Sequence, residues 1–160
     1  LRHSAFRRCV DAIAALSRIA QEEGVRLAVE SEGSATKWDR LLLQTPDEFE
    51  EFASAIPQAA AGINVNVGHL NLASKVFSFE PLTFLDQVAP RVVAFELSHN
   101  DGTRDQHLPP RPGHWYESIL TDSRFAEIPM IIECRATPIE EVLEAYRWVS
   151  LVRGDSNWEQ

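Results

Sequence analysis

The sequence predicts an α/β fold made of four parallel βα units. Four short runs are almost continuously apolar and rich in Val and Ile, and helical patterns separate and flank them. Such runs are typical of buried parallel strands, and strands that alternate with helices form a sheet with right-handed crossovers. The four units predict either an open sheet with helices on both faces or the second half of a (β/α)₈ barrel. The chain has 160 residues, whereas a whole barrel needs about 250.

The chain begins with a helix, which apolar residues at helical spacing predict and a glycine ends. These residues are Phe6, Val10, Ile13, Leu16 and Ala20, followed by Gly24. Thr45-Pro46-Asp47-Glu48 and Thr137-Pro138-Ile139-Glu140 are capping boxes with Pro at the first helical position, so each predicts a helix start. The other predicted elements are short helices at 82–88 and 115–120 and strands at 25–30, 62–68, 92–98 and 129–134.

The composition is that of an ordinary globular protein and suits one partial barrel domain over residues 1–160, with 44% hydrophobic and 24% charged residues. The net charge of -9 argues against a surface that grips phosphate backbones. No apolar run approaches the roughly 20 residues of a membrane span. Cys9 and Cys134 do not resemble a disulfide framework, so a reducing cytoplasm is the expected location.

Each predicted strand has one fully apolar face and one face with a polar residue near its carboxyl end, because side chains alternate along a strand. These polar residues are Glu30, Asn66, Glu96 and Glu133. Three glutamates that converge at one end of a sheet repel one another, and a bound divalent metal removes that repulsion. The alternative is that each strand end reaches solvent, where a single glutamate is harmless.

The segment 98–107 concentrates metal-binding residue types after the third strand. It contains His99, Asp101, Asp105 and His107 within ten residues. Histidine and carboxylate bind zinc, manganese and iron, and loops at the carboxyl ends of buried strands hold the chemistry of α/β proteins. The segment therefore predicts part of a metal site.

These pieces together resemble the xylose isomerase-like TIM barrel superfamily, which includes sugar-phosphate isomerases and epimerases and the AP endonuclease family. Residues 27–30 resemble its strand ending in a metal-ligand glutamate, and residues 66–69 its Asp-x-Gly-His turn. Residues 96–107 resemble its His-x-x-Asp-Asn…Asp-x-His loop, and residues 131–133 its closing strand. The resemblance covers nearly the whole chain as strands five to eight, the carboxyl-terminal half of the TIM barrel.

The resemblance implies that Glu30, Asn66, Glu96 and Glu133 hold one divalent metal and that Glu30 and Glu133 are the catalytic residues, moving protons to and from carbon. Asn66 stands where the family has aspartate and Glu96 where it has histidine. Asn can coordinate through its carbonyl, and Glu is a harder ligand that favours Mn or Mg over Zn. The endonuclease-like members use further ligands, which correspond to three residues intact here: His69, Asp105 and His107.

The leading hypothesis is a metal-dependent isomerase or epimerase of a small sugar or sugar-like polyol, with Mn, Mg, Co or Zn as the divalent metal. The expected substrate-binding residues are His69, His99 and Arg104. The alternatives are a metal-dependent phosphodiesterase of the AP endonuclease type and a degenerate relative without catalysis. Nucleic acid and membrane are not expected partners. Because four βα units leave open strand edges, we expect either a missing amino-terminal half or a homo-oligomer.

Overall fold

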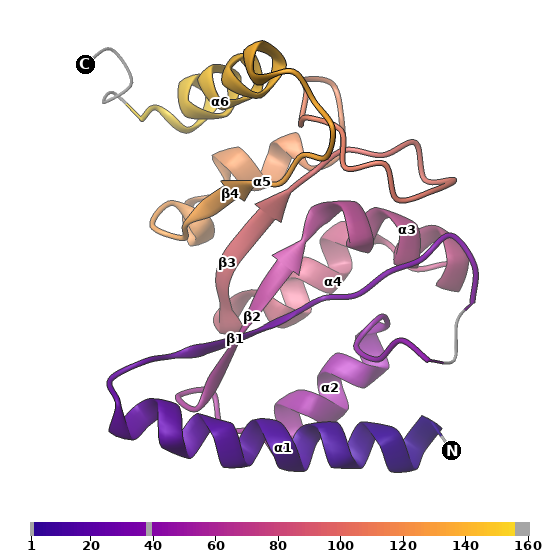
Figure 1. Cartoon of the computed structure of the whole chain (residues 1–160), viewed down its shortest axis with the longest axis vertical. Coiled ribbons are helices and arrows are strands. Elements are labelled where there is room, and N and C mark those ends of the chain that lie inside the picture. The colour runs from indigo at the N-terminus through magenta and orange to yellow at the C-terminus, as the bar shows by residue number, and fades with distance from the viewer. Residues whose placement is uncertain (1, 38–39, 156–160) are drawn as a thin grey trace.

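The computed structural model describes residues 2–37 and 40–155 and contains one four-stranded sheet flanked by helices (Figure 1). The strands are β1 (Leu27–Glu30), β2 (Ala61–Asn66), β3 (Val92–Leu97) and β4 (Met130–Ile132). The α-helices are α1 (Arg2–Glu22), α2 (Pro46–Ala55), α3 (Val67–Phe77), α4 (Pro81–Val88), α5 (Glu117–Thr121) and α6 (Ile139–Arg153). Two short 3₁₀ turns, Ala89–Arg91 and Ser123–Phe125, precede β3 and β4.

All strand pairs are parallel and the strands lie in chain order, β1-β2-β3-β4. The register places Glu30 beside Asn64, Asn66 beside Glu96, and Glu96 beside Ile131. The carboxyl ends of the strands therefore form one edge, along which the polar residues gather. Figure 1 shows α1 and α6 at opposite ends of the molecule, next to the two outer strands.

The helices cover one face of the sheet, which decides between the two predicted architectures. Ile63, Val65, Phe95 and Leu97 are buried in a core shared with residues of α1, α2, α3 and α4. On the opposite face Ala28 is exposed and the Ile131 residue is 50% exposed. An apolar face under helices and an open polar face are what half of a (β/α)₈ barrel has, whereas a doubly wound sheet carries helices on both faces.

The predicted elements are confirmed, with differences in several bounds, in one added helix and in one helix cap. Strand β1 begins at Leu27 rather than Val25, which lies outside the sheet and is 58% exposed. Helix α3 is missing from the predicted elements, because its first residues continue the apolar pattern of the second strand; the Asn66 side chain caps it. Helix α2 has the predicted Thr45 cap, but α6 does not use its capping box, since the Thr137 hydroxyl donates to the Arg135 carbonyl instead.

The two outer strands have free edges within the described residues, because β1 pairs only with β2 and β4 only with β3. Large apolar side chains are exposed on the elements at both ends of the sheet. They are Leu16 and Ile19 of α1 and Val25 before β1, together with Ile131 of β4 and Ile139, Leu143 and Tyr146 of α6. Within the described residues, none of the helices combines the length and the apolar character that a membrane span requires.

Replacement of Phe95 by Ala tests the core. The Phe95 side chain is fully buried and meets the Phe125 ring edge-on at 4.9 Å between centroids. Removing a buried ring leaves a cavity, so we expect the free energy of unfolding to fall by about 3–5 kcal/mol in urea titrations. Leu82→Ala, at a side chain that is 45% exposed, is the control and should cost less than about 1 kcal/mol. Equal losses in the two variants would contradict this core.

Candidate functional site

The four polar residues at the strand ends meet at one nitrogen atom. The Asn66 Nδ2 lies 3.0 Å from a carboxylate oxygen of each of Glu30, Glu96 and Glu133. We call these four residues the carboxylate ring. Asn66 is fully buried, whereas the side chains of Glu30 and Glu133 are each 39% exposed on the open face of the sheet. The convergence expected from strand alternation is therefore present, and it is organised by an amide.

The orientation of the Asn66 amide is fixed from both ends. Its Oδ1 accepts the His69 backbone N–H at 3.1 Å and caps α3, so its Nδ2 must face the glutamates. Turning the amide over would place a carbonyl oxygen against three carboxylates and an NH₂ group against an N–H. The Ser31 hydroxyl, which sequence reasoning missed, accepts the Asn66 backbone N–H at 2.9 Å and holds the strand end in place.

The three glutamates are not equivalent. Glu96 accepts hydrogen bonds from two amides, Asn64 at 2.8 Å and Asn66 at 3.0 Å. Burial raises the pKa of Glu30, and the Glu96 charge adds to this effect against the opposing Asn66 hydrogen bond. An amide nitrogen has two hydrogens for three carboxylates, so one contact lacks a donor. The raised pKa of Glu30 favours its protonated form.

Two histidines and one aspartate connect the outer members of the ring. His69 Nδ1 lies 3.3 Å from Glu30 Oε1, and His107 Nδ1 lies 3.1 Å from Glu133 Oε2. The Nε2 atoms of His69 and His107 face the same Asp105 oxygen, at 3.6 and 2.7 Å. The result is a continuous line of groups from β1 to the end of β4, with Asp105 at its centre.

The carboxylate ring offers a divalent metal three carboxylates, but in this orientation it does not offer the oxygen of its central amide. Its central residue presents an N–H donor, and coordination through the Asn66 carbonyl would require giving up the α3 cap. The His–Asp–His cluster, defined as His69, Asp105 and His107, does fit a metal. One ligand atom from each residue lies within 4.8 Å of the others, and each histidine has its second nitrogen on a glutamate, as metal-binding histidines generally do.

The backbone positions this cluster closely. His107 has a φ of 47°, a left-handed conformation rare for a residue other than glycine, and such strain gathers at functional sites. Antiparallel hydrogen bonds between His99 and Leu108 close the loop that carries it. A Cβ atom on Gly33 would lie 2.0 Å from the His69 carbonyl oxygen, so only glycine allows the segment after β1 to approach α3 this closely.

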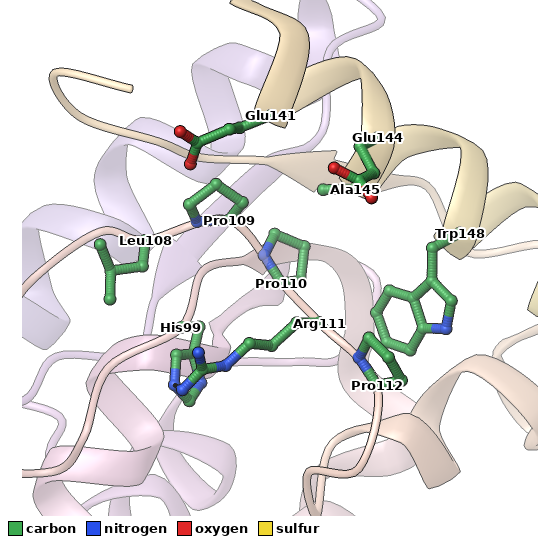
Figure 2. A pocket seen from close by; sticks show the side chains of 10 residues that line it. All are labelled: His99, Leu108, Pro109, Pro110, Arg111, Pro112, Glu141, Glu144, Ala145 and Trp148. Carbon is green, nitrogen blue, oxygen red and sulfur yellow. Dashed lines mark hydrogen bonds between the residues drawn. The ribbon is translucent and has the colours of Figure 1, made fainter. Parts of the chain in front are cut away.

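The structure does not bring the other two predicted substrate-binding residues to the ring. His99 is 5% exposed and turns toward the helix layer, where its ring nitrogens meet Arg111 and Tyr116. Figure 2 shows His99 and Arg111 side by side at the wall of a groove between 108–112 and α6. Arg104 is exposed in the loop, and its charge acts on the neighbouring Asp101.

The family model described as xylose isomerase-like TIM barrel matches residues 2–151. A D-tagatose 3-epimerase-like protein superposes with a TM-score of 0.73 at 17% identity, over 92% of this chain and 54% of that chain. D-psicose 3-epimerase, solved in the presence of D-fructose, superposes with a TM-score of 0.73 at 15% identity, over 96% of this chain and 58% of that chain. A protein from Thermus thermophilus, soaked with ZnCl2, superposes with a TM-score of 0.65 at 18% identity, over 98% of this chain and 57% of that chain.

No curated protein matches the chain. At these identities the superpositions show the fold. The chain spans just over half the length of each of these solved chains, so it corresponds to a half-barrel within them.

Metal binding by the Asn66→Asp variant tests the difference between the ring and the cluster. We expect the unchanged chain to bind one divalent ion, which His107→Ala removes. Asn66→Asp should add a second ion at the ring and raise the stoichiometry from about one to about two, because a fourth carboxylate replaces the central N–H donor. The measurement is metal stoichiometry by calorimetry and elemental analysis. A single ion that Glu96→Gln removes and His107→Ala leaves in place would contradict this assignment.

Acid titration of the His99→Gln variant tests the buried histidine. Burial, His114 and Arg111 lower the pKa of His99 to about 4. Between this value and the ordinary value near 6.5, the unfolded chain binds a proton that the folded chain does not, so stability falls as the pH drops. We expect the unchanged chain to lose about 1–3 kcal/mol more than His99→Gln over this window in urea titrations. His3→Gln, at an exposed histidine on α1, is the control; a similar change there would contradict the prediction.

Proposed function

Because this chain belongs to the xylose isomerase-like TIM barrel family, we propose that it forms part of an isomerase or epimerase that acts on a small sugar or a related polyol. The observation that carries the proposal is the pair Glu30 and Glu133, which reach the same amide from the ends of the two outer strands. Two carboxylates that face one substrate carbon from two sides can remove a proton and return it on the other face. Solved neighbours named as sugar 3-epimerases support this substrate class.

Glu30 and Glu133 have different surroundings, which suits opposite roles in proton transfer. The raised pKa of Glu30 favours its protonated form, so Glu30 acts as the acid. Glu133 lies 3.1 Å from His107, which holds its carboxylate in place, so Glu133 acts as the base. Asn66 keeps both oxygens at the open face of the sheet, where a substrate can reach them.

The His–Asp–His cluster is the place for the metal in this proposal. Two imidazoles and one carboxylate are a ligand set that suits zinc and manganese and leaves coordination positions open. When bound, a divalent metal supplies a Lewis acid that polarises a carbonyl or a pair of hydroxyls. His69 and His107 then carry their other ring proton toward Glu30 and Glu133, which fixes the orientation of these carboxylates.

We further propose that additional βα units complete the barrel at the free edges of β1 and β4, supplied by an amino-terminal half or by a second copy. The exposed apolar residues beside both edges support this, since Val25 and Ile131 are 58% and 50% exposed. The length of the solved neighbours supports it as well. Such units would also cover the open face on which Glu30 and Glu133 lie. The mass of the purified protein in solution distinguishes a monomer from a pair.

A metal-dependent phosphodiesterase is the second candidate, favoured by the intact His–Asp–His cluster. The net charge of -9 opposes the approach of a nucleic acid. Chelator-sensitive cleavage of an oligonucleotide with one abasic site would favour this candidate over the first.

Exchange of carbon-bound hydrogen tests the proposed chemistry. We expect the Mn-loaded protein to incorporate deuterium from D₂O into D-fructose at carbon, followed by NMR. Glu30→Gln and Glu133→Gln should each lower the exchange rate by about 100-fold or more, since an amide cannot carry the proton. Glu51→Gln, at an exposed position of α2, should leave the rate unchanged. If metal-loaded protein exchanges no hydrogen in any ketose or polyol tested, the chain is a relative without this chemistry.

A further inference from the structure

A second hollow lies on the other side of the β3 end, between α3 and the loop that follows the strand. It has a volume of about 370 Å³ and is lined by Lys75, Ser98, Arg111 and Trp115 among others; we call it the cationic pocket. We propose that the cationic pocket binds the phosphate group of a small phosphorylated molecule. The proposal is independent of the isomerase chemistry, because none of these four residues belongs to the carboxylate ring or to the His–Asp–His cluster.

The guanidinium of Arg111 keeps its full charge in this pocket. Its Nε and Nη2 donate to His114 Nε2 at 3.1 Å and to His99 Nε2 at 2.9 Å. Both histidines are neutral near pH 7, because burial first and then nearby cationic groups lower the pKa of each. Among the described residues no carboxylate lies within ion-pair distance of Arg111. Neutral acceptors orient the group without neutralising it, and three of its five N–H donors remain for a ligand.

A second cation and one carboxylate complete the charges. Lys75 uses one N–H on the Asp101 carbonyl at 3.0 Å and keeps two donors. The Asp101 carboxylate also borders the pocket, but it turns to Thr103, accepting from its backbone N–H at 2.8 Å and its hydroxyl at 2.6 Å. Lys75 and Arg111 carry two positive charges, whereas the carboxylate of Asp101 is hydrogen-bonded to Thr103. The pocket is therefore locally positive in a chain of net charge -9. This contrast favours a doubly charged anion as ligand.

The Ser98 hydroxyl is the observation that points to a ligand. Ser98 is 1% exposed and borders the pocket, and its Oγ has no hydrogen-bond partner among the described residues. A buried hydroxyl without a partner is costly, and native structures generally satisfy such groups. The Ser98 Oγ packs against Gly68, so rotation of its side chain would be needed for a phosphate oxygen in the pocket to accept this hydrogen bond together with those of Arg111 and Lys75.

The volume of the cationic pocket and the residues that line it indicate the kind of molecule that it binds. At about 370 Å³ the hollow falls in the range of small-molecule sites, roughly 300–1,000 Å³, and exceeds what a bare phosphate ion fills. Trp115 and Tyr116 offer aromatic surface at the same hollow. The occupant is therefore a phosphate monoester with a small organic part, which the three donors hold by its phosphate. Figure 2 shows that Arg111 and His99 also border the groove of 108–112, so the guanidinium stands between two hollows.

Calorimetric titration with inorganic phosphate and with glycerol 3-phosphate, at pH 7.5 and constant ionic strength, tests the proposal. We expect saturable binding of both anions, tighter for glycerol 3-phosphate, and no binding of glycerol. Arg111→Gln and Lys75→Met should each weaken binding by about tenfold or more, because each removes a charge-assisted contact to phosphate. Ser98→Ala should weaken it by less.

The controls keep the result interpretable. Arg18→Gln, at an exposed position of α1 outside the pocket, should leave binding unchanged. Lys75 is itself exposed, so Lys75→Met remains informative if Arg111→Gln disturbs the loop, and circular dichroism checks both folds. Absence of saturable binding of either anion overturns the proposal. Equal affinity in the unchanged chain, Lys75→Met and a folded Arg111→Gln overturns it as well.

Discussion

The candidate site depends on the two-sided hydrogen bonding of one buried amide. The Asn66 oxygen caps α3 and its nitrogen faces three carboxylates at 3.0 Å, so neither end can change without the other. The cap sets where α3 begins and hence where His69 stands, while the nitrogen sets where the glutamates converge. The neutral amide of Asn66 thus holds the three carboxylates together, as a bound cation would, without adding a positive charge. Burial raises the pKa of Glu30, and the charge of the neighbouring Glu96 adds to this effect.

The exposure of Glu30 and Glu133 to water depends on whether further βα units cover the open face of the sheet. Glu30 ends β1 and Glu133 directly follows β4, so both lie near the edges that further βα units would cover. Their side chains are each 39% exposed, and covering them would remove water from both carboxylates. Desolvation disfavours the charged form and would raise the pKa of Glu30 further. Completion of the barrel would therefore affect the protonation of Glu30 as well as shape a cavity.

The sequence predicted the features that follow from the alternation of side chains along strands, and it missed those that depend on the orientation of one side chain. Strand alternation has a period of two, so the apolar and polar faces and the meeting of Glu30, Asn66, Glu96 and Glu133 followed from it. The direction of the Asn66 amide did not, because it is decided by the α3 cap, and α3 itself begins within the predicted second strand. His99 lies beyond the end of β3, where alternation no longer applies, and its turn toward Arg111 depends on a contact across twelve residues of loop.

The two polar regions of the chain have opposite charge, and the fold keeps them apart. Glu96 belongs to the carboxylate ring, while His99, three residues later, meets Arg111 at the cationic pocket. Helix α3 serves both regions, with His69 in its first turn at the glutamates and Lys75 in its last turn at the pocket. If Lys75 or Arg111 reached the glutamates, ion pairs would form and lower the carboxylate pKa values, which would remove the acid that proton transfer needs. Asn66 orients the glutamates, and His99 and His114 orient Arg111. Because these partners are neutral, they do not cancel the charge of the groups that they orient.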